Sequence, residues 1–315
     1  MGLTIFAPEF LFMHSAATKR DIFIGIGLAV LATFIWSGNF IIARGVYKQI
    51  PPISLNFYRW LCASVIVFPF ALKKFKIEWP VVKQSWHYFF WISLTGVSLF
   101  NTFVYIGGHY TTAINLALIG TTSSPVFSVI LARIFLKEKI GWLKVFGIII
   151  CIIGILFLLS RGDFRNLLSF RFTKGDGWIL LAALTFAVYN TMVKKKPVAV
   201  TPINFLFVVF SLGTILLFPF YLWEIFHTVP VEWNIKLFSV ILYLGIGASV
   251  ISFLIWNTAI HKLGAGRTAL FGNLIPIFSS IEAWIILHEQ FTWIHVISMV
   301  LVFGGIMLAN LRLLR

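Results

Sequence analysis

The sequence predicts an all-α integral membrane protein, from its composition, the length of its apolar runs and their repetition along the chain. Of the 315 residues, 60% are hydrophobic and only 11% are charged, whereas roughly a quarter is charged in soluble domains. Apolar runs long enough to cross a hydrocarbon core of ~30 Å, which takes about 20 helical residues, recur along the whole length. Because these runs lack the short alternation of barrel strands, we expect helices that satisfy their backbone hydrogen bonds internally.

Hydropathy and the breaks in the apolar pattern predict ten transmembrane helices. In chain order, these spans cover residues 22–46, 53–72, 86–107, 112–136, 140–160, 177–193, 203–223, 236–259, 265–287 and 291–311. The chain then divides into an N-terminal extension (1–20), a first five-span unit (21–160), a connecting loop (161–176), a second five-span unit (177–311) and a C-terminal tail (312–315).

The distribution of basic residues sets the expected orientation of these spans. The net charge is +15, and the cytoplasmic loops of membrane proteins are rich in Lys and Arg. With the N-terminus in the cytoplasm, the inner segments hold 17 of the 25 Lys and Arg and the outer segments hold seven, which leaves only Arg59 inside a span. We therefore expect both termini in the cytoplasm, and the charge requires no nucleic-acid partner. The basic loop from Arg161 to Lys174 is the exception, because this orientation puts it outside.

The two five-span units are related by an internal repeat at an offset of 150 or 151 residues. The matches in order are Pro52 with Pro202, the FPF motif at 68–70 with that at 218–220, Pro125 with Pro276, Glu138 with Glu289, Trp142 with Trp293 and Gly154 with Gly305. An odd number of spans makes the second copy enter the membrane from the opposite side, so the sequence predicts two inverted five-helix repeats. Many secondary transporters have this architecture; the alternative is that the duplication only builds a stable bundle.

Four segments follow a pattern found in a known group of membrane proteins: LAVLATFIWSGNFIIAR (28–44), YRW (58–60), and the SPVF...FLKE and IPIF...ILHE ends of the two copies. With them the chain resembles the drug/metabolite transporter (DMT) superfamily, and most closely its EamA-type branch of ten-helix exporters, over about residues 20–311. The resemblance implies two five-helix halves around a central cavity. It also implies movement of amino acids or other small metabolites, commonly outward across the bacterial inner membrane, without fixing the substrate.

Polar groups inside the hydrocarbon are costly, so those within the spans are expected to face a cavity or a partner. In the first span, Trp36 and Asn39 lie three residues apart and share a helical face, and the repeat matches them with Phe186 and Tyr189 of the sixth span. The resemblance implies that the Trp36 and Asn39 face lines the central cavity. Packing between neighbouring helices is the alternative.

The third and eighth spans add further candidates for binding. Asn101 and Tyr105 are one helical turn apart, and an offset of 152 pairs Tyr105 with Asn257. Their neutral hydrogen bonds suit the polar ends of a zwitterion, and bonding between helices is the alternative. In the fourth and ninth spans, Pro125 and Pro276 predict kinks, because a proline inside a helix frees the carbonyl one turn earlier.

Arg59 and Glu282 are the two charges deepest in the predicted spans. Counted along the helix, Arg59 lies ~9 Å and Glu282 ~8 Å from the outer end of its span. Their similar depth predicts a salt bridge between them. Glu282 is also a candidate proton acceptor, or a counter-ion for a substrate amine, and snorkelling to the outer interface is the alternative.

These patterns together predict a secondary active transporter that exports amino acids or related compounds by alternating access around a central cavity. The alternative within this class is an uptake carrier or exchanger for an aromatic, nucleobase or nucleotide-like metabolite, which the 17% of aromatic residues favours. A different class is a non-transporting membrane scaffold or a membrane-embedded enzyme. We expect no enzyme, because the sequence lacks a deep convergent cluster of titratable groups.

The expected location is the bacterial inner membrane, which the chain crosses many times. The expected partners are a small-molecule substrate and the lipid bilayer, and no nucleic acid is expected. Whether the chain forms a homodimer is left undecided by the sequence. No cofactor is expected, because the glycine-rich pieces lie inside spans and neither Cys nor His residues have the spacing of a metal site.

Overall fold

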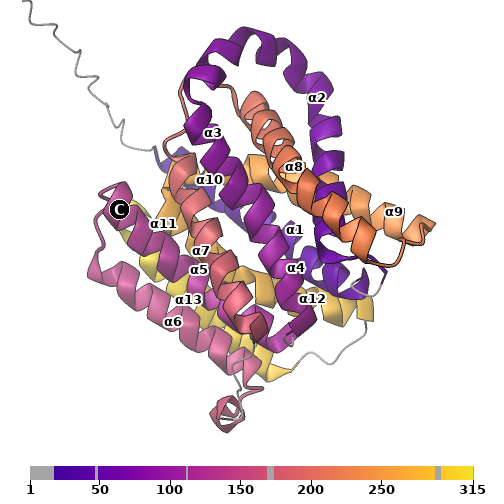
Figure 1. Cartoon of the computed structure of the whole chain (residues 1–315). Helices are drawn as coiled ribbons and strands as arrows, with labels where there is room; N and C mark the ends of the chain where they lie inside the picture. The colour runs from indigo at the N-terminus through magenta and orange to yellow at the C-terminus, as the bar shows by residue number, and fades with distance from the viewer. Residues whose placement is uncertain (1–17, 47–48, 111–112, 169–173, 288–291, 315) are drawn as a thin grey trace, which may run out of the picture.

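The computed structural model is a bundle of helices (Figure 1). It describes residues 18–46, 49–110, 113–168, 174–287 and 292–314, and these ranges hold no strand. The first half contains α1 (Lys19–Val46), α2 (Pro52–Gln84), α3 (Trp86–Ser93), the π-helical η1 (Leu94–Leu99), α4 (Phe100–Tyr110), α5 (Ala113–Phe135), α6 (Trp142–Leu159) and the 3-10 helix η2 (Phe164–Leu167). The second half contains α7 (Lys174–Val193), α8 (Pro202–His227), α9 (Ile235–Leu242), the π-helical η3 (Tyr243–Ile251), α10 (Ser252–Leu263), α11 (Ala265–Thr268), the 3-10 helix η4 (Ala269–Leu274), α12 (Ile275–Leu287) and α13 (Trp293–Leu314).

These elements fall on the predicted spans. The third span is the continuous helix α3–η1–α4, the eighth is α9–η3–α10, and the ninth is divided into α11, η4 and α12. Within the described residues, six helical stretches are long and apolar enough to cross a membrane, and shorter apolar helices lie in the fourth, fifth and tenth spans. The all-α membrane class is confirmed, and the helices agree with ten spans.

The two halves of the chain pack against each other, and two of the helix pairs between them consist of equivalent spans. α2 packs along α8 and α6 packs along α13, and both pairs can be followed in Figure 1. α1 packs against α10 and α12, just as α7 packs against α4 and α5. In the repeat, α1 matches α7, α4 matches α10 and α5 matches α12. The contacts that α1 makes with the second half therefore correspond to those that α7 makes with the first half. Each half therefore packs mainly against the other.

The α2 and α8 helices cap each other's N-termini with buried carboxylates. Glu224 of α8 accepts hydrogen bonds from the backbone N–H of Ser54 at 2.5 Å and from its hydroxyl at 2.7 Å, at the start of α2. Glu78 of α2 accepts from the backbone N–H of Thr201 at 3.0 Å and from the Asn204 amide at 2.7 Å, at the start of α8. A negative charge is stabilising at the positive end of a helix dipole. These contacts hold the two helices antiparallel, and they explain why α2 runs beyond residue 72, where its predicted span ended.

Large aromatic side chains fill the interior between α2, α8 and α10. Trp60 lies edge-on to Phe253 with the ring centroids 5.2 Å apart, and its ring is 4.8 Å from that of Phe210. Trp256 and Tyr189 are also almost completely buried. Because such ring pairs have preferred geometries, this core positions the side chains of α10 that reach the cavity described next.

Candidate functional site

A cavity of about 80 Å³ lies between the two halves of the bundle. Its wall takes residues from α1, α2, α4 and α5 in the first half and from α7, α10, η4 and α12 in the second half. The lining side chains that carry the argument are Trp36, Arg59, Asn101, Phe186, Phe253 and Trp256. A single water needs roughly 10–15 Å³ of such space, so the cavity has room for a small solute in this conformation.

Aromatic rings from both halves form most of one wall. The centroid of the Trp36 ring lies 4.9 Å from that of Trp256, 5.6 Å from that of Phe253 and 5.7 Å from that of Phe186. Phe186 also stacks on Phe100 at 4.5 Å. The contacts of Trp36 with Phe253 and Phe186 are edge-to-face, a favoured arrangement of aromatic pairs. The wall is therefore a rigid, apolar surface suited to an apolar or aromatic group.

Arg59 brings a cation to this apolar cavity. Its side chain is 1% exposed, and it donates from Nε to Ser249 Oγ at 2.7 Å and from Nη2 to the Ala248 carbonyl at 2.9 Å. Its Nη1 donates to Asn101 Oδ1 at 3.0 Å and to the Tyr105 hydroxyl at 3.1 Å. All four of these acceptors are uncharged. They fix the plane of the guanidinium at the cavity wall without adding a negative charge.

Two of the four acceptors of Arg59, the Ala248 carbonyl and the Ser249 hydroxyl, belong to the π-helical segment η3. The Ala248 carbonyl accepts from Trp36 Nε1 at 2.8 Å as well as from Arg59. A π-helix shifts its backbone bonds from four to five residues apart, and here the N–H of Ser252 reaches the carbonyl of Gly247. η3 thus turns a backbone carbonyl in the middle of a span toward two side chains of the cavity.

In the equivalent segment η1, a backbone carbonyl also accepts a hydrogen bond from a side chain of α2. Asn56 of α2 is fully buried, and its Nδ2 donates to Thr102 Oγ1 at 2.9 Å and approaches the Ser98 carbonyl at 3.3 Å. Asn56 and Arg59 lie three residues apart, on one side of α2. α2 therefore contacts the π-helical segments of both halves.

The structure places the predicted binding residues in two groups. Trp36 and Asn101 line the cavity, whereas Tyr105 reaches it only through its bond to Arg59. Tyr189 donates to Asn257 Oδ1 at 2.9 Å, and the two are buried side chains outside the cavity lining. This bond joins α7 to α10, whereas the buried Nδ2 of Asn257 has no hydrogen-bond partner among the described residues. The side chain of Asn39 lies outside the described residues, although its backbone belongs to α1.

The two predicted kinks have different local structures. Pro125 lies within α5, which is α-helical on both sides of it, and it lines the cavity. Pro276 is the second residue of α12 and directly follows the 3-10 segment η4. A proline is well tolerated in the first turn of a helix, because its missing N–H has no partner there. In the ninth span the irregular backbone therefore precedes the proline.

The predicted salt bridge between Arg59 and Glu282 is not formed between these two described side chains. Glu282 instead contacts Ser37 of α1, with Oε1 2.6 Å from the Ser37 hydroxyl. The prediction was wrong because equal depth in the membrane fixes only the position along each helix. Arg59 is turned toward η3 and α4, whereas Glu282 is turned toward α1.

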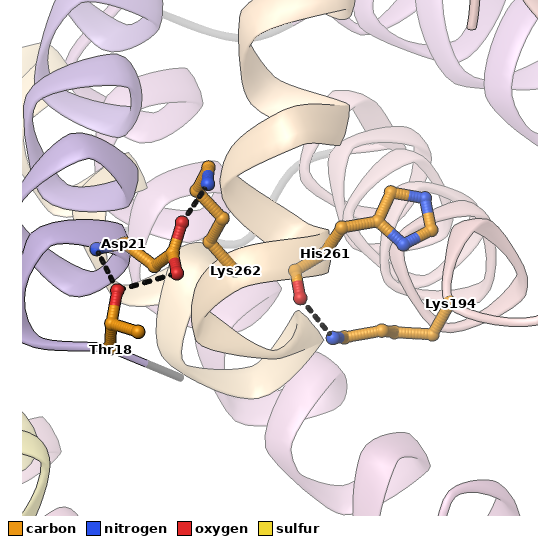
Figure 2. Close-up of polar contacts among 5 residues, drawn as sticks. All are labelled: Thr18, Asp21, Lys194, His261 and Lys262. Atoms are coloured by element: carbon orange, nitrogen blue, oxygen red, sulfur yellow. Dashed lines mark hydrogen bonds and ion pairs between the residues drawn. The ribbon is translucent and has the colours of Figure 1, made fainter. Parts of the chain in front are cut away.

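At one end of the bundle, α10 is tied to α1 and α7 (Figure 2). Lys262 pairs with Asp21, whose backbone N–H also bonds to Thr18 Oγ1 at 3.2 Å. Lys194, just after α7, donates to the backbone carbonyl of His261 at 2.7 Å, and Figure 2 shows both contacts at the last turn of α10. Burial lowers the pKa of the Lys194 ammonium. Cations are stabilising at the negative end of a helix dipole, so the contacts close this end of the bundle.

The sequence reasoning missed the contribution of the eighth span to the aromatic wall. Phe253 and Trp256 are three residues apart, and an offset of 153 matches them with Phe100 and Phe103 of the third span. All but Phe103 line the cavity. A pair of aromatic residues at this spacing in both copies was the signal that could have found the wall.

Comparisons with known proteins agree with this geometry. The profile of the EamA-like transporter family matches residues 23–160 and 173–311. An uncharacterized transporter of Archaeoglobus fulgidus is 27% identical over 285 residues, which cover 90% of this chain and 96% of that protein. A probable terminal-alkyne amino-acid exporter of Streptantibioticus cattleyicolor is 28% identical over 193 residues, or 61% of this chain and 62% of that protein. A solved crystal structure with 17% identity shares the fold over 93% of this chain and 97% of its own, with a TM-score of 0.72.

Proposed function

Because the chain belongs to the EamA-like transporter family, we propose that it is a secondary active transporter that exports amino acids or related small metabolites by alternating access. Family membership makes it a transporter and not an enzyme. The observation that carries the proposal is the arrangement of Arg59, a buried cation in the wall of a cavity that is otherwise mainly apolar.

The proposed substrate has a carboxylate at one end and an apolar body at the other. The hydrogen bonds described above use four of the five N–H groups of Arg59, so a substrate carboxylate would replace a neutral acceptor such as Asn101 Oδ1. The exchange would be favourable, because charge-assisted hydrogen bonds are roughly twice as strong as neutral ones. The guanidinium is already oriented by Ser249 and Asn101, so little side-chain entropy is lost when a substrate binds. The rings of Trp36 and Phe186 offer an apolar surface to the rest of the molecule.

Alternating access is supported by the relation between the two halves. The sequence repeat, the exchangeable helix pairs and the reciprocal caps of α2 and α8 all fit two inverted five-helix repeats. In such a plan the halves exchange conformations around a site near the midplane. The cavity, which both halves line, is the proposed site.

The relative from Streptantibioticus cattleyicolor supports amino acids as the cargo, because its name describes a probable exporter of an amino acid. The charge distribution supports an inner-membrane location with both termini in the cytoplasm, since 17 of 25 Lys and Arg then lie on the inner side. The lipid bilayer and the small-molecule substrate are the partners that this function requires.

A second candidate is an uptake carrier or exchanger for an aromatic or nucleobase-like metabolite without a carboxylate. The ring wall formed by Trp36, Phe253 and Trp256 favours it. The two candidates differ in what Arg59 does. Only the first requires a negative group on the substrate.

Counterflow in proteoliposomes distinguishes the two candidates. The probes are phenylalanine, phenethylamine, which lacks the carboxylate, and adenine. We expect counterflow of phenylalanine and none of phenethylamine. Equal counterflow of phenylalanine and phenethylamine would refute the role of the carboxylate, adenine alone would favour the second candidate, and no flux of any probe would argue against transport.

The Asn101→Asp variant tests the same idea inside the protein. The new carboxylate would replace the amide oxygen that lies 3.0 Å from Arg59 Nη1 and form an internal ion pair. The fold should be retained, whereas a substrate carboxylate loses an interaction worth about 1.5–3 kcal/mol, or roughly tenfold to a hundredfold in half-saturation. Arg165→Lys, on an exposed loop, is the control. Unchanged phenylalanine counterflow in Asn101→Asp would count against Arg59 as the anchor.

A further inference from the structure

Glu282 of α12 contacts α1 away from the lining of the cavity. Its Oε1 is 2.6 Å from the Ser37 hydroxyl. Its Oε2 is buried and makes no hydrogen bond in the part of the chain that the structure describes. An ionised carboxylate in such surroundings is expensive, because it has lost its water without gaining compensating donors.

The hydroxyl groups of Ser37 and Tyr243 each have a carbonyl acceptor on α1. Ser37 Oγ donates to the Phe34 carbonyl at 2.5 Å, and the Tyr243 hydroxyl donates to the Ile35 carbonyl at 2.6 Å. Both Tyr243 and Glu282 flank Gly38: a Cβ built there would lie 2.5 Å from the Tyr243 oxygen and 3.8 Å from Glu282 Oε2.

A hydroxyl group has one proton, and this decides what it can offer to Glu282. Ser37 has two acceptors within reach of its one proton, the Phe34 carbonyl at 2.5 Å and Glu282 Oε1 at 2.6 Å. Two oxygens at 2.6 Å repel each other unless a proton lies between them. Both contacts are satisfied together when Ser37 donates to Phe34 and Glu282 is a neutral carboxylic acid that donates from Oε1 to Ser37 Oγ.

The charges on the neighbouring elements leave this conclusion unchanged. The elements that pack against α12 are α1, η4, α13 and α5. Their described ionisable side chains are Lys19, Arg20, Asp21, Arg133 and His295. The first two and Arg133 are exposed, Asp21 pairs with Lys262, and the His295 ring contacts Thr292. Tyr243, from η3, is the titratable group that faces Glu282.

α1, which contacts Glu282, also contributes to the cavity wall, and η3 binds Arg59 of that wall. α1 carries Ser37 next to Trp36, and η3 begins at Tyr243 and continues to Ser249, which binds Arg59. When Glu282 loses its proton, the Ser37 hydroxyl can donate to the carboxylate only by leaving the Phe34 carbonyl. A change at Glu282 therefore reaches α1 next to Trp36, which lies in the cavity wall.

From this geometry, we propose that Glu282 is a proton-binding site through which a proton gradient drives transport. The proton binds Glu282 from one side of the membrane and is released to water on the other, in exchange for the substrate held at the cavity. This inference rests on the proposed transport function. Its two parts, a protonated Glu282 and a coupled flux, are measured separately.

Infrared spectroscopy of the purified protein in lipid tests the protonation. At neutral pH we expect the C=O stretch of a buried carboxylic acid, with its shift in heavy water, in the wild type and in Glu232→Gln, whose carboxylate is exposed. The band should be absent from Glu282→Gln. A wild type without the band, or a band that survives in Glu282→Gln, would overturn the inference whether or not the protein transports phenylalanine.

Flux measurements test the coupling. Glu282→Gln resembles the protonated state, because its amide can donate to Ser37 in place of the acid proton. We expect this variant to retain phenylalanine counterflow and to lose the accumulation that a pH gradient drives in the wild type. If Glu282→Gln keeps the full response to the gradient, the coupling role is wrong although the transport function stands. If the wild type shows no counterflow, the transport function and the coupling both fail, and the infrared band still reports on Glu282.

Discussion

The reciprocal caps of α2 and α8 allow a differential prediction, because the two carboxylates use their oxygens differently. Glu224 uses both: Oε1 accepts from the backbone N–H of Ile53 at 3.1 Å, and Oε2 accepts twice from Ser54. Within the described residues, Glu78 uses only Oε2, which accepts from Thr201 and Asn204. Replacing each by Gln keeps the shape and changes one oxygen into an N–H₂ group.

The expected destabilisation follows from this count. In Glu78→Gln, the remaining oxygen can occupy the place of Oε2, so the variant loses only the charge at a helix N-terminus, worth about 0.3–1 kcal/mol. In Glu224→Gln, an N–H₂ group must face the N–H of Ile53 or of Ser54. That variant loses a charge-assisted hydrogen bond as well, worth about 1.5–3 kcal/mol. Glu224→Gln should therefore be less stable than Glu78→Gln by about 2 kcal/mol.

Thermal unfolding in detergent measures this difference. For a chain of this size, 1 kcal/mol corresponds to roughly 2–4 °C, so we expect the melting temperature of Glu224→Gln to lie about 4–8 °C below that of Glu78→Gln. Glu232→Gln, in the exposed loop after α8, should match the wild type. Equal melting temperatures for Glu78→Gln and Glu224→Gln, or the reverse order, would refute the assignment of donors to the two carboxylates.

Three further substitutions test single contacts. Trp36→Phe keeps an aromatic ring in the wall but removes the Nε1 bond to η3, and should lower the stability by about 0.5–1.5 kcal/mol in the same melting assay. Gly96→Ala puts a methyl group into the Tyr189 ring, and overpacking of this kind costs about 1–3 kcal/mol; a wild-type melting temperature would show that η1 and α7 are farther apart. Asp21→Asn breaks the pair with Lys262 at a partly exposed site, so its melting temperature should stay close to that of the wild type.

The helices could be predicted from the sequence because each span needs about 20 apolar residues, and that requirement leaves a clear pattern. The length of α2 could not be predicted from the sequence. Its last turns are polar, and they stay helical beside α8, where Glu78 binds the first residues of that helix. The π-helical segments also leave no periodic signal, since they are defined by backbone bonds and not by side-chain type. What was missed depends on contacts between distant parts of the chain.

For the candidate site, the position of a residue along its helix was predictable, and the direction of its side chain was not. Trp36, Asn101 and Arg59 were singled out because polar and charged groups inside spans need partners, and all three line the cavity. Tyr189 and Asn257 met the same criterion, yet they bond to each other. A hydropathy pattern records how far a residue lies along its helix and leaves open which neighbour it faces.

Two charged residues that match apolar residues in the repeat explain how a nearly symmetric scaffold could act on an asymmetric substrate. Arg59 matches Val209 at an offset of 150, and Glu282 matches Leu131 at 151. Both π-helical segments receive a side chain from α2, but only η3 receives a cation. In the proposed transporter, a cavity with one charged end would bind a carboxylate in a single orientation, and the two repeated halves would exchange shapes. Because Glu282 contacts α1 and not Arg59, the proton and the substrate would occupy separate sites that α1 connects.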